Sequence, residues 1–213
     1  MQQIFKVPFI DKSVLWHNED ATLVIGMNGA GKTLLLGEMM AWCDKSGISY
    51  NHYNAMEALY DAEFLINDSD DNDVIMACKM MSEISHDFDE DVKRWATVYN
   101  GGKCGYDDPA LLRHVLSMAG NGYTRMYIMT VLAVRNPAAA YYFIDMPETS
   151  LHIMLLRRIS SYLMENFRYM KFVFATHSPE VFASLELEHG SEEEKRRIIS
   201  LPEDFLENQA EMA

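Results

Sequence analysis

The sequence predicts an α/β fold with a mainly parallel core sheet flanked by helices. Three apolar segments carry this prediction, at residues 21–25, 140–145 and 171–176, because each has the length of a buried strand and each precedes a helical pattern. Strands that alternate with helices along a chain are typical of parallel sheets. The length of 213 residues and the hydrophobic content of 49% fit one domain with a continuous core.

The first part of the chain predicts a hairpin, a strand and a long helix. Residues 3–10 and 13–17 have the pattern of two short strands joined by a turn, which predicts an N-terminal antiparallel hairpin. The strand at residues 21–25 leads directly into a glycine-rich loop. Residues 32–44 then carry apolar side chains at helical spacing, and Gly47 provides the stop signal.

The middle of the chain predicts a strand at residues 48–53 and then a mostly helical lobe at about residues 55–118. The helices of this lobe are expected at residues 55–66, 74–88, 91–99 and 108–118. Asp108 and Pro109 suit the N-cap and the first turn of the last of these helices. The acidic segment 67–73 is interpreted as a solvated loop, because it lacks the glycine and the glutamate that an EF-hand calcium loop needs.

The last part of the chain predicts alternating helices and strands, followed by a charged terminus. We expect these elements at residues 123–134 (helix), 140–145 (strand), 149–166 (helix) and 171–176 (strand). A glycine-rich break at residues 120–122 precedes them, and Ser178-Pro179 begins one more helix. Residues 1–190 are expected to form a single domain, and residues 191–213 a charged surface helix and a tail.

The charge of the chain argues against broad nucleic-acid binding. There are 32 acidic and 18 basic side chains, which give a formal net charge of -14, so the surface as a whole should repel phosphate backbones. A local basic patch formed by Arg157, Arg158, Arg168 and Lys171 could oppose this field. Nucleic acid is therefore expected only through such a patch or through a partner protein.

Cysteine usage and hydropathy favour a cytoplasmic protein. The three cysteines, Cys43, Cys78 and Cys104, are far apart and form no CxxC pair, which fits reduced thiols. The N-terminus lacks the apolar core of a signal peptide. The longest apolar stretch, residues 126–143, is interrupted by Arg135-Asn136-Pro137, so we expect no membrane span.

A glycine-rich loop at residues 26–33 is the strongest functional signal. It reads Gly-Met-Asn-Gly-Ala-Gly-Lys-Thr, which is the GxxxxGK[ST] pattern of a P-loop, and it lies between an apolar strand and a helix. In that position, backbone N–H groups and the Lys32 ammonium can hold the phosphates of a nucleoside triphosphate. The expected phosphate contacts are Asn28, Gly29, Ala30, Gly31, Lys32 and Thr33.

A magnesium ion should accompany the nucleotide. The Thr33 hydroxyl is a hard oxygen ligand of the kind that Mg²⁺ prefers. Asp145 ends a buried strand, and the ligands of parallel sheets collect where the strands end. We therefore expect Thr33 and Asp145 to bind Mg²⁺ together.

Two later segments resemble a known family. Residues 143–152 read Phe-Ile-Asp-Met-Pro-Glu-Thr-Ser-Leu-His, and residues 172–179 read Phe-Val-Phe-Ala-Thr-His-Ser-Pro. With the glycine loop, they resemble ATP-binding-cassette (ABC) type ATPase heads, most closely the branch with the SMC and RecF heads and the ATPase of overcoming-lysogenization-defect nucleases. The resemblance spans residues 21 to about 182. It implies ATP as ligand and a homodimer that sandwiches two nucleotides head to tail.

The resemblance also implies roles for three further sites. His177 matches the histidine that contacts the γ-phosphate, and residues 149–152 match the D-loop at the dimer interface. Residues 119–125 take the place of the signature loop, where Gly120 and Gly122 would contact the nucleotide of the opposing subunit. The usual serine is absent there, because Gly120 occupies its position.

Two departures from the family concern hydrolysis. The family places its catalytic glutamate directly after the magnesium aspartate, but here that residue is Met146, which cannot accept a proton from water. Glu148 lies two residues further on and is the alternative base. The Q-loop glutamine is also missing, and Asn54 is either its substitute or an ordinary strand-to-helix cap.

Three hypotheses remain. The leading one is an ATP-dependent dimerisation switch with slow or absent hydrolysis. The second is a working ATPase that uses Glu148 and drives a partner nuclease or a DNA-repair or defence complex. The third is a small-molecule P-loop kinase, in which Arg94 or Arg113 of the helical lobe would reach the transferred phosphoryl group.

Overall fold

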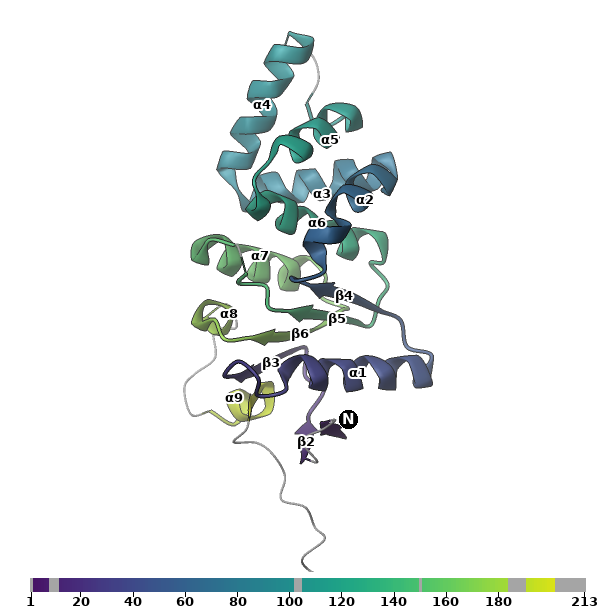
Figure 1. The fold of residues 1–213 in the computed structure, drawn as a ribbon, viewed down its shortest axis with the longest axis vertical. Coiled ribbons are helices and arrows are strands. Elements are labelled where there is room, and N and C mark those ends of the chain that lie inside the picture. Colours follow the sequence, from purple (N-terminus) through teal and green to yellow (C-terminus); the bar gives the residue numbers. More distant parts are fainter. Residues whose placement is uncertain (1, 8–11, 102–104, 150, 184–190, 202–213) are drawn as a thin grey trace, which may run out of the picture.

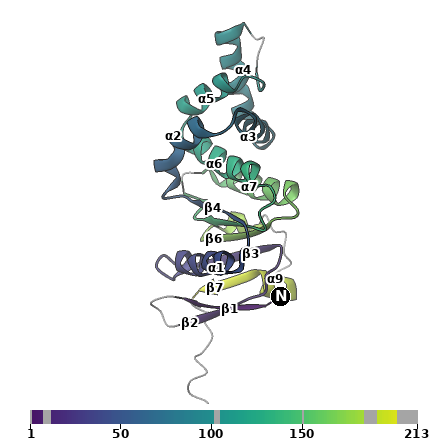
Figure 2. The same ribbon diagram turned by 90° about the vertical axis from the view of Figure 1, so that its right-hand side faces the viewer.

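The computed structural model describes residues 2–7, 12–101, 105–149, 151–183 and 191–201. Within these segments the elements form three parts, which Figure 1 shows stacked along the long axis of the molecule. A helical lobe lies at one end, a parallel sheet lies in the middle, and a two-stranded hairpin lies at the other end. A view turned by 90° gives the same order (Figure 2).

The core sheet is entirely parallel and confirms the expected α/β architecture. Its spatial order is β4-β5-β6-β3-β7. These strands are β3 (Ala21–Gly26), β4 (Tyr50–Asn54), β5 (Tyr141–Asp145), β6 (Lys171–Thr176) and β7 (Ile198–Leu201). Side chains alternate between the two faces, so that Phe172 and Phe174 enter the core beneath the helical lobe, whereas Val173 and Ala175 enter the core on the α1 side.

Strand β7 corrects the expectation for the C-terminal segment. We expected residues 191–213 to be a surface helix and a tail, and α9 (Glu192–Arg197) agrees with the first half of that prediction. Ile198–Leu201 instead pair with β3 and bury Ile199 and Leu201. The strand has only four residues and follows a highly charged segment. Periodicity over so short a stretch does not distinguish a strand from an irregular tail. The rest of the expected tail, residues 202–213, lies outside the described residues.

One face of the sheet is covered by α1 (Lys32–Ser46) and by the predicted antiparallel hairpin of β1 (Gln3–Val7) and β2 (Lys12–Trp16). Aromatic side chains join these layers. Trp16 lies 5.9 Å from Trp42 of α1 and 5.5 Å from Tyr141 of β5, measured between ring centroids. These contacts fix α1, and with it the end of the glycine loop, against the sheet.

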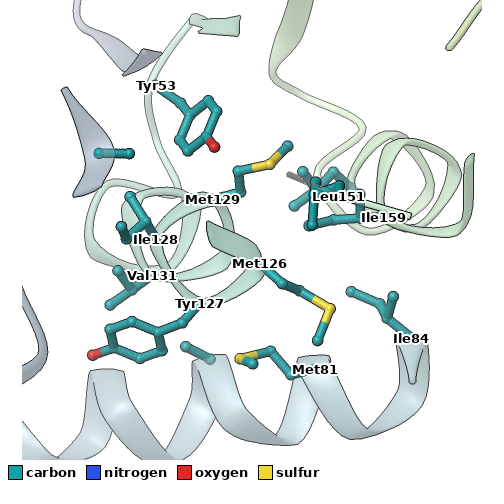
Figure 3. Packing of buried hydrophobic residues seen from close by; sticks show 14 of the residues in the cluster. Tyr53, Met81, Ile84, Met126, Tyr127, Ile128, Met129, Val131, Leu151 and Ile159 are labelled. Atoms are coloured by element: carbon teal, nitrogen blue, oxygen red, sulfur yellow. The ribbon is translucent and has the colours of Figure 1, made fainter. Parts of the chain in front are cut away.

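The other face carries the other helices of the described segments apart from α9, which contacts β3 and β7. They are α2 (Ala58–Asp68), α3 (Asp71–Ile84), α4 (His86–Asn100), α5 (Pro109–Met118), α6 (Asn121–Arg135), α7 (Ile153–Asn166) and α8 (Pro179–Ala183). Figure 3 shows α6 enclosed by this core, where Met126 and Tyr127 approach α3, and Met129 points towards Leu151. No helix in the described segments is long and apolar enough to span a membrane.

The acidic segment 67–73 is not the loop that we expected. Helix α2 continues to Asp68 and α3 begins at Asp71, so only two residues separate them. Acidic side chains favour the first turn of a helix, because they complement its dipole. Arg113 of α5 then ties the junction together, with hydrogen bonds of 2.7 Å to Asp71 and 2.6 Å to the Ser69 carbonyl oxygen.

The boundary between the next two helices also differs from the prediction. We expected helices at residues 74–88 and 91–99, but the break falls at Ser85, between α3 and α4. The Ser85 hydroxyl accepts a hydrogen bond from the Phe88 N–H and caps α4. A capping serine inside a continuous helical pattern is a weak signal in the sequence, because the pattern alone does not reveal the change of direction.

Candidate functional site

The glycine loop connects β3 to α1 with the geometry that its glycines allow. Gly31 is the N-cap of α1 and has φ 96°, a left-handed conformation that favours glycine. Gly26 has φ 153°, and a β-carbon added there would lie 2.5 Å from the carbonyl oxygen of Leu201. The first glycine of the loop is therefore required by β7, which the sequence analysis did not foresee.

Lys32 is held inside this loop. Its side chain is buried, and Nζ donates hydrogen bonds of 2.7 Å to the Gly26 carbonyl oxygen and 3.0 Å to the Met27 carbonyl oxygen. An ammonium group has three protons, so one remains for a ligand. Asn28 and Gly29 are exposed beside it, at the N-terminal end of α1. This arrangement offers a cation, backbone N–H groups and a helix dipole to an anion.

Thr33 and Asp145 meet where α1 and β5 approach each other. The Thr33 hydroxyl donates a hydrogen bond of 2.8 Å to Asp145 Oδ2, and Asp145 is only 2% exposed. The other carboxylate oxygen, Oδ1, is buried and has no hydrogen-bond partner in the described part of the chain. A buried carboxylate oxygen without a donor is unfavourable unless a cation satisfies it. These oxygens fit a hard divalent cation such as Mg²⁺.

The electrostatics of Asp145 agree with that assignment. Burial raises the pKa of Asp145, while the Thr33 hydrogen bond and the neighbouring His52 act in the opposite direction. Burial also lowers the pKa of His52, against the nearby charges of Glu57 and Asp145. A cation bound to Asp145 would favour the ionised carboxylate and so reverse the effect of burial.

Asn54 forms hydrogen bonds both to the turn before α2 and to Asp145. Its Oδ1 accepts hydrogen bonds from the N–H groups of Met56, at 2.8 Å, and Glu57, at 3.4 Å, which caps the turn before α2. Its Nδ2 donates to Asp145 Oδ2 at 3.4 Å. The next residue, Ala55, donates its N–H to the Asp145 carbonyl oxygen at 3.1 Å. The turn between β4 and α2 is thus bonded directly to the candidate metal ligand.

Arg125 links the same turn to α6 and was not assigned a separate role from the sequence. Its side chain is 2% exposed, and Nη1 donates 2.7 Å to the Ala55 carbonyl oxygen and 3.4 Å to the Tyr53 hydroxyl. Its Nε has no partner in the described segments. A buried guanidinium bonded mainly to backbone holds two elements in register. An arginine directly before the apolar run of this helix was the available sequence signal.

Glu148 and His177 form a close pair at the end of β6. Glu148 Oε1 lies 2.7 Å from His177 Nδ1 and accepts the His177 N–H at 3.1 Å, while Oε2 accepts the Thr176 hydroxyl at 2.7 Å. The side chain of Glu148 is 12% exposed and that of His177 is 52% exposed. Glu148 therefore anchors the turn from β6 to α8, and His177 is the member of the pair that faces solvent.

Met146 occupies the position directly after Asp145. It has φ 53°, and its N–H donates to the Ala175 carbonyl oxygen at 2.8 Å. The side chain is partly buried against the core beneath the helical lobe. This position therefore offers neither a base nor a metal ligand, as its residue type already indicated.

Gly120 and Gly122 lie in a different place from the glycine loop. They line a cavity of about 450 Å³ together with His152, Tyr123 and Arg158. No residue of the glycine loop is among the residues that line it. The structure thus joins Thr33 to Asp145 and Glu148 to His177, but it does not bring Gly120 and Gly122 to the phosphate loop of the same chain.

The basic residues that could form a patch are divided among several contacts. Lys171 Nζ donates to the Asn18 carbonyl oxygen at 2.6 Å, and Arg168 Nε donates to the Glu165 carbonyl oxygen at 3.1 Å. Arg157 and Arg158 are exposed on α7 and line a groove with Glu83. Arg157 and Arg158 are therefore the two basic residues of the expected patch whose side chains stay available to a ligand.

The chain has remote similarity to known proteins at the level of structure. No model of a protein family matches the chain, and no curated protein matches it. Among solved structures, the chain is similar to one described as an inward-facing conformation of a candidate metal-chelate type ABC transporter. The two are 14% identical, the match covers 86% of this chain and 75% of that chain, and the TM-score is 0.46.

Proposed function

We propose that this chain binds ATP with Mg²⁺ as an ABC-type ATPase head, and that ATP drives two copies to associate. The observation that carries the proposal is the Thr33–Asp145 pair beside the glycine loop, with the buried Asp145 Oδ1 lacking a donor in the described chain. The sequence segments around Asp145 and His177 favour the branch of SMC, RecF and overcoming-lysogenization-defect heads. In this role the protein is cytoplasmic and acts through an effector protein.

The phosphates of ATP are held by residues of the glycine loop. Asn28, Gly29, Ala30 and Gly31 supply backbone N–H groups, and Lys32 supplies a charge. Thr33 and Asp145 would hold Mg²⁺, which supplies positive charge to the phosphate oxygens. His177, positioned by Glu148, contacts the terminal phosphate from the end of β6. ADP lacks the terminal phosphate, so the contacts of His177 and of the second copy with that phosphate are the ones that distinguish ATP from ADP.

The second copy completes the site in this proposal. Gly120 and Gly122 line a cavity that none of the glycine-loop residues lines, which supports a contact across a head-to-tail dimer. Exposed apolar side chains lie both at the glycine loop and beside the cavity of Gly120. Met27 of the glycine loop is 82% exposed, and Met118 and Met154, next to the Gly120 loop and in the cavity wall, are 63% and 53% exposed. Burying such side chains stabilises an interface.

Hydrolysis is slow in this proposal, because no carboxylate follows Asp145. Met146 cannot remove a proton from water. Glu148 already accepts two hydrogen bonds, from the Thr176 hydroxyl and from the His177 N–H, and its Oε1 lies 2.7 Å from His177 Nδ1. These contacts favour a positioning role for Glu148. Slow turnover would let the closed dimer persist, which suits a switch.

The test measures mass by light scattering with Mg·ATP, with Mg·ADP and without nucleotide. We expect a dimer with ATP alone, and a monomer in all three conditions for Lys32→Ala. A wild-type protein that stays monomeric with ATP would refute the switch. Phosphate release is measured in parallel for Glu148→Gln. Rapid release by the wild type that disappears in this variant, with ATP binding retained, would support the working ATPase instead.

A further inference from the structure

The cavity that contains Gly120 lies at the start of three helices. Ser85, Gly120 and His152 are the N-caps of α4, α6 and α7, and all three line it. The side chains of Ser85 and His152 each accept a hydrogen bond from their own helix, but Gly120 has no side chain to do so. The N–H groups at the start of α6 are therefore the ones left for an external acceptor.

Arg158, in the second turn of α7, also lines this cavity. It is exposed and forms no hydrogen bond or ion pair with any residue of the described segments. Asp87 lines the same cavity but does not pair with it. The adjacent Arg157 differs in one respect: it lines only the neighbouring groove, with Glu83 and Glu165, and not the cavity of Gly120.

The N-cap of α6 offers no hydroxyl to an external acceptor. The residue at the start of α6 is glycine, and the nearby Ser117 directs its hydroxyl to the His114 carbonyl oxygen of its own helix, at 2.8 Å. Each chain also carries a net charge of -14, so two copies repel each other, and bound nucleotide adds negative charge between them. A guanidinium at the cavity would supply both a donor and a compensating charge.

We propose that Arg158 binds the terminal phosphate of the ATP held by a second copy of the chain, beside the N-cap position of α6, where Gly120 has no side chain. This inference rests on the proposed ATP-dependent dimer. The planar guanidinium donates to two phosphate oxygens at once, which a single hydroxyl does not. The contact exists only in the dimer and only with a triphosphate, so Arg158 contributes to association and not to the first binding of ATP.

The experiment compares Arg158→Ala with Arg157→Ala as the matched control on the same exposed helix. Sedimentation velocity gives the dimer dissociation constant with Mg·ATP and with Mg·ADP, and calorimetry at concentrations below association gives the ATP affinity of the monomer. We expect Arg158→Ala to weaken the ATP dimer roughly tenfold or more, the range for a lost charged hydrogen bond. Monomer ATP affinity and thermal unfolding should match the wild type. Arg158→Lys should recover part of the loss.

The outcomes separate this inference from the proposed function. If the wild type forms an ATP dimer and Arg158→Ala forms it equally well, the assignment of Arg158 is wrong and the switch stands. If Arg157→Ala weakens the dimer as much as Arg158→Ala, or if Arg158→Ala weakens association equally with ADP, the effect is one of general surface charge. Either result would also overturn the assignment. If the wild type never associates, the dimer itself fails and the contact with it.

Discussion

The hydroxyl of Thr33 and the carboxylate of Asp145 are joined by a hydrogen bond of 2.8 Å although 112 positions separate them in the chain. The strand order brings them together, because only β6 lies between β5 and β3 in the sheet, and α1 packs across all three strands. The bond places one end of the glycine loop beside a buried carboxylate.

In the absence of ligand, Asp145→Asn should be more stable than the wild type near neutral pH, and this difference should grow as the pH rises. Burial raises the pKa of Asp145 above its ordinary value of 3.8. A raised folded-state pKa gives stability that is full below the unfolded pKa and is lost as the pH rises through the folded pKa. Urea denaturation from pH 4 to pH 7 should give a free energy of unfolding that is increasingly higher for the variant than for the wild type. An exposed carboxylate, Asp44, provides the Asp→Asn control, and a pH-independent difference would contradict the argument.

Met146→Glu should convert the protein into a faster ATPase. The new carboxylate follows Asp145 directly and can accept a proton from water, a contribution of roughly a hundredfold or more to the rate. Met146→Gln has the same length without the base and should leave the rate unchanged. Phosphate release under saturating Mg·ATP measures both. Equal rates in the two variants would show that a missing base is not what limits turnover.

Gly26→Ala should destabilise the fold, whereas Gly37→Ala should not. A β-carbon at Gly26 meets the Leu201 carbonyl oxygen at 2.5 Å, so β7 or the glycine loop must shift, at a cost of about 1–3 kcal/mol. Gly37 lies within α1 with open space around it, and alanine there should stabilise the helix by about 0.5–1 kcal/mol. Chemical denaturation gives both values. A neutral Gly26→Ala would argue against the pairing of β7 with β3.

Arg113→Ala should weaken the helical lobe and leave nucleotide binding intact. The guanidinium contacts Asp71 and the Ile66 and Ser69 carbonyl oxygens, and loss of these bonds should cost about 2–3 kcal/mol. Within the described residues, Arg94 pairs only with Asp91, on an exposed helix face, so Arg94→Ala should change stability little. Thermal unfolding and ATP calorimetry measure the two effects. A specific loss of phosphoryl transfer without loss of stability would instead favour the kinase hypothesis.

Local sequence patterns sufficed for most strands and for the loop between β3 and α1. The apolar runs at β5 and β6 are fully buried, so their composition alone identifies them. The helical lobe was less well predicted. Its acidic junction and its break at Ser85 depend on bonds from Arg113 and on a capping hydroxyl, which the pattern of apolar residues does not encode.

The sequence by itself determined the glycine loop, the parallel strands and the residue types at Asp145, Met146 and His177. The tertiary structure decided which of these meet, and it alone revealed that β7 lies against Gly26 and that Arg125 holds the Ala55 carbonyl oxygen. The physical reason is one of range. Strands and helices follow from neighbouring side chains, whereas the partner of a buried polar atom is set by packing between segments that lie far apart in the chain.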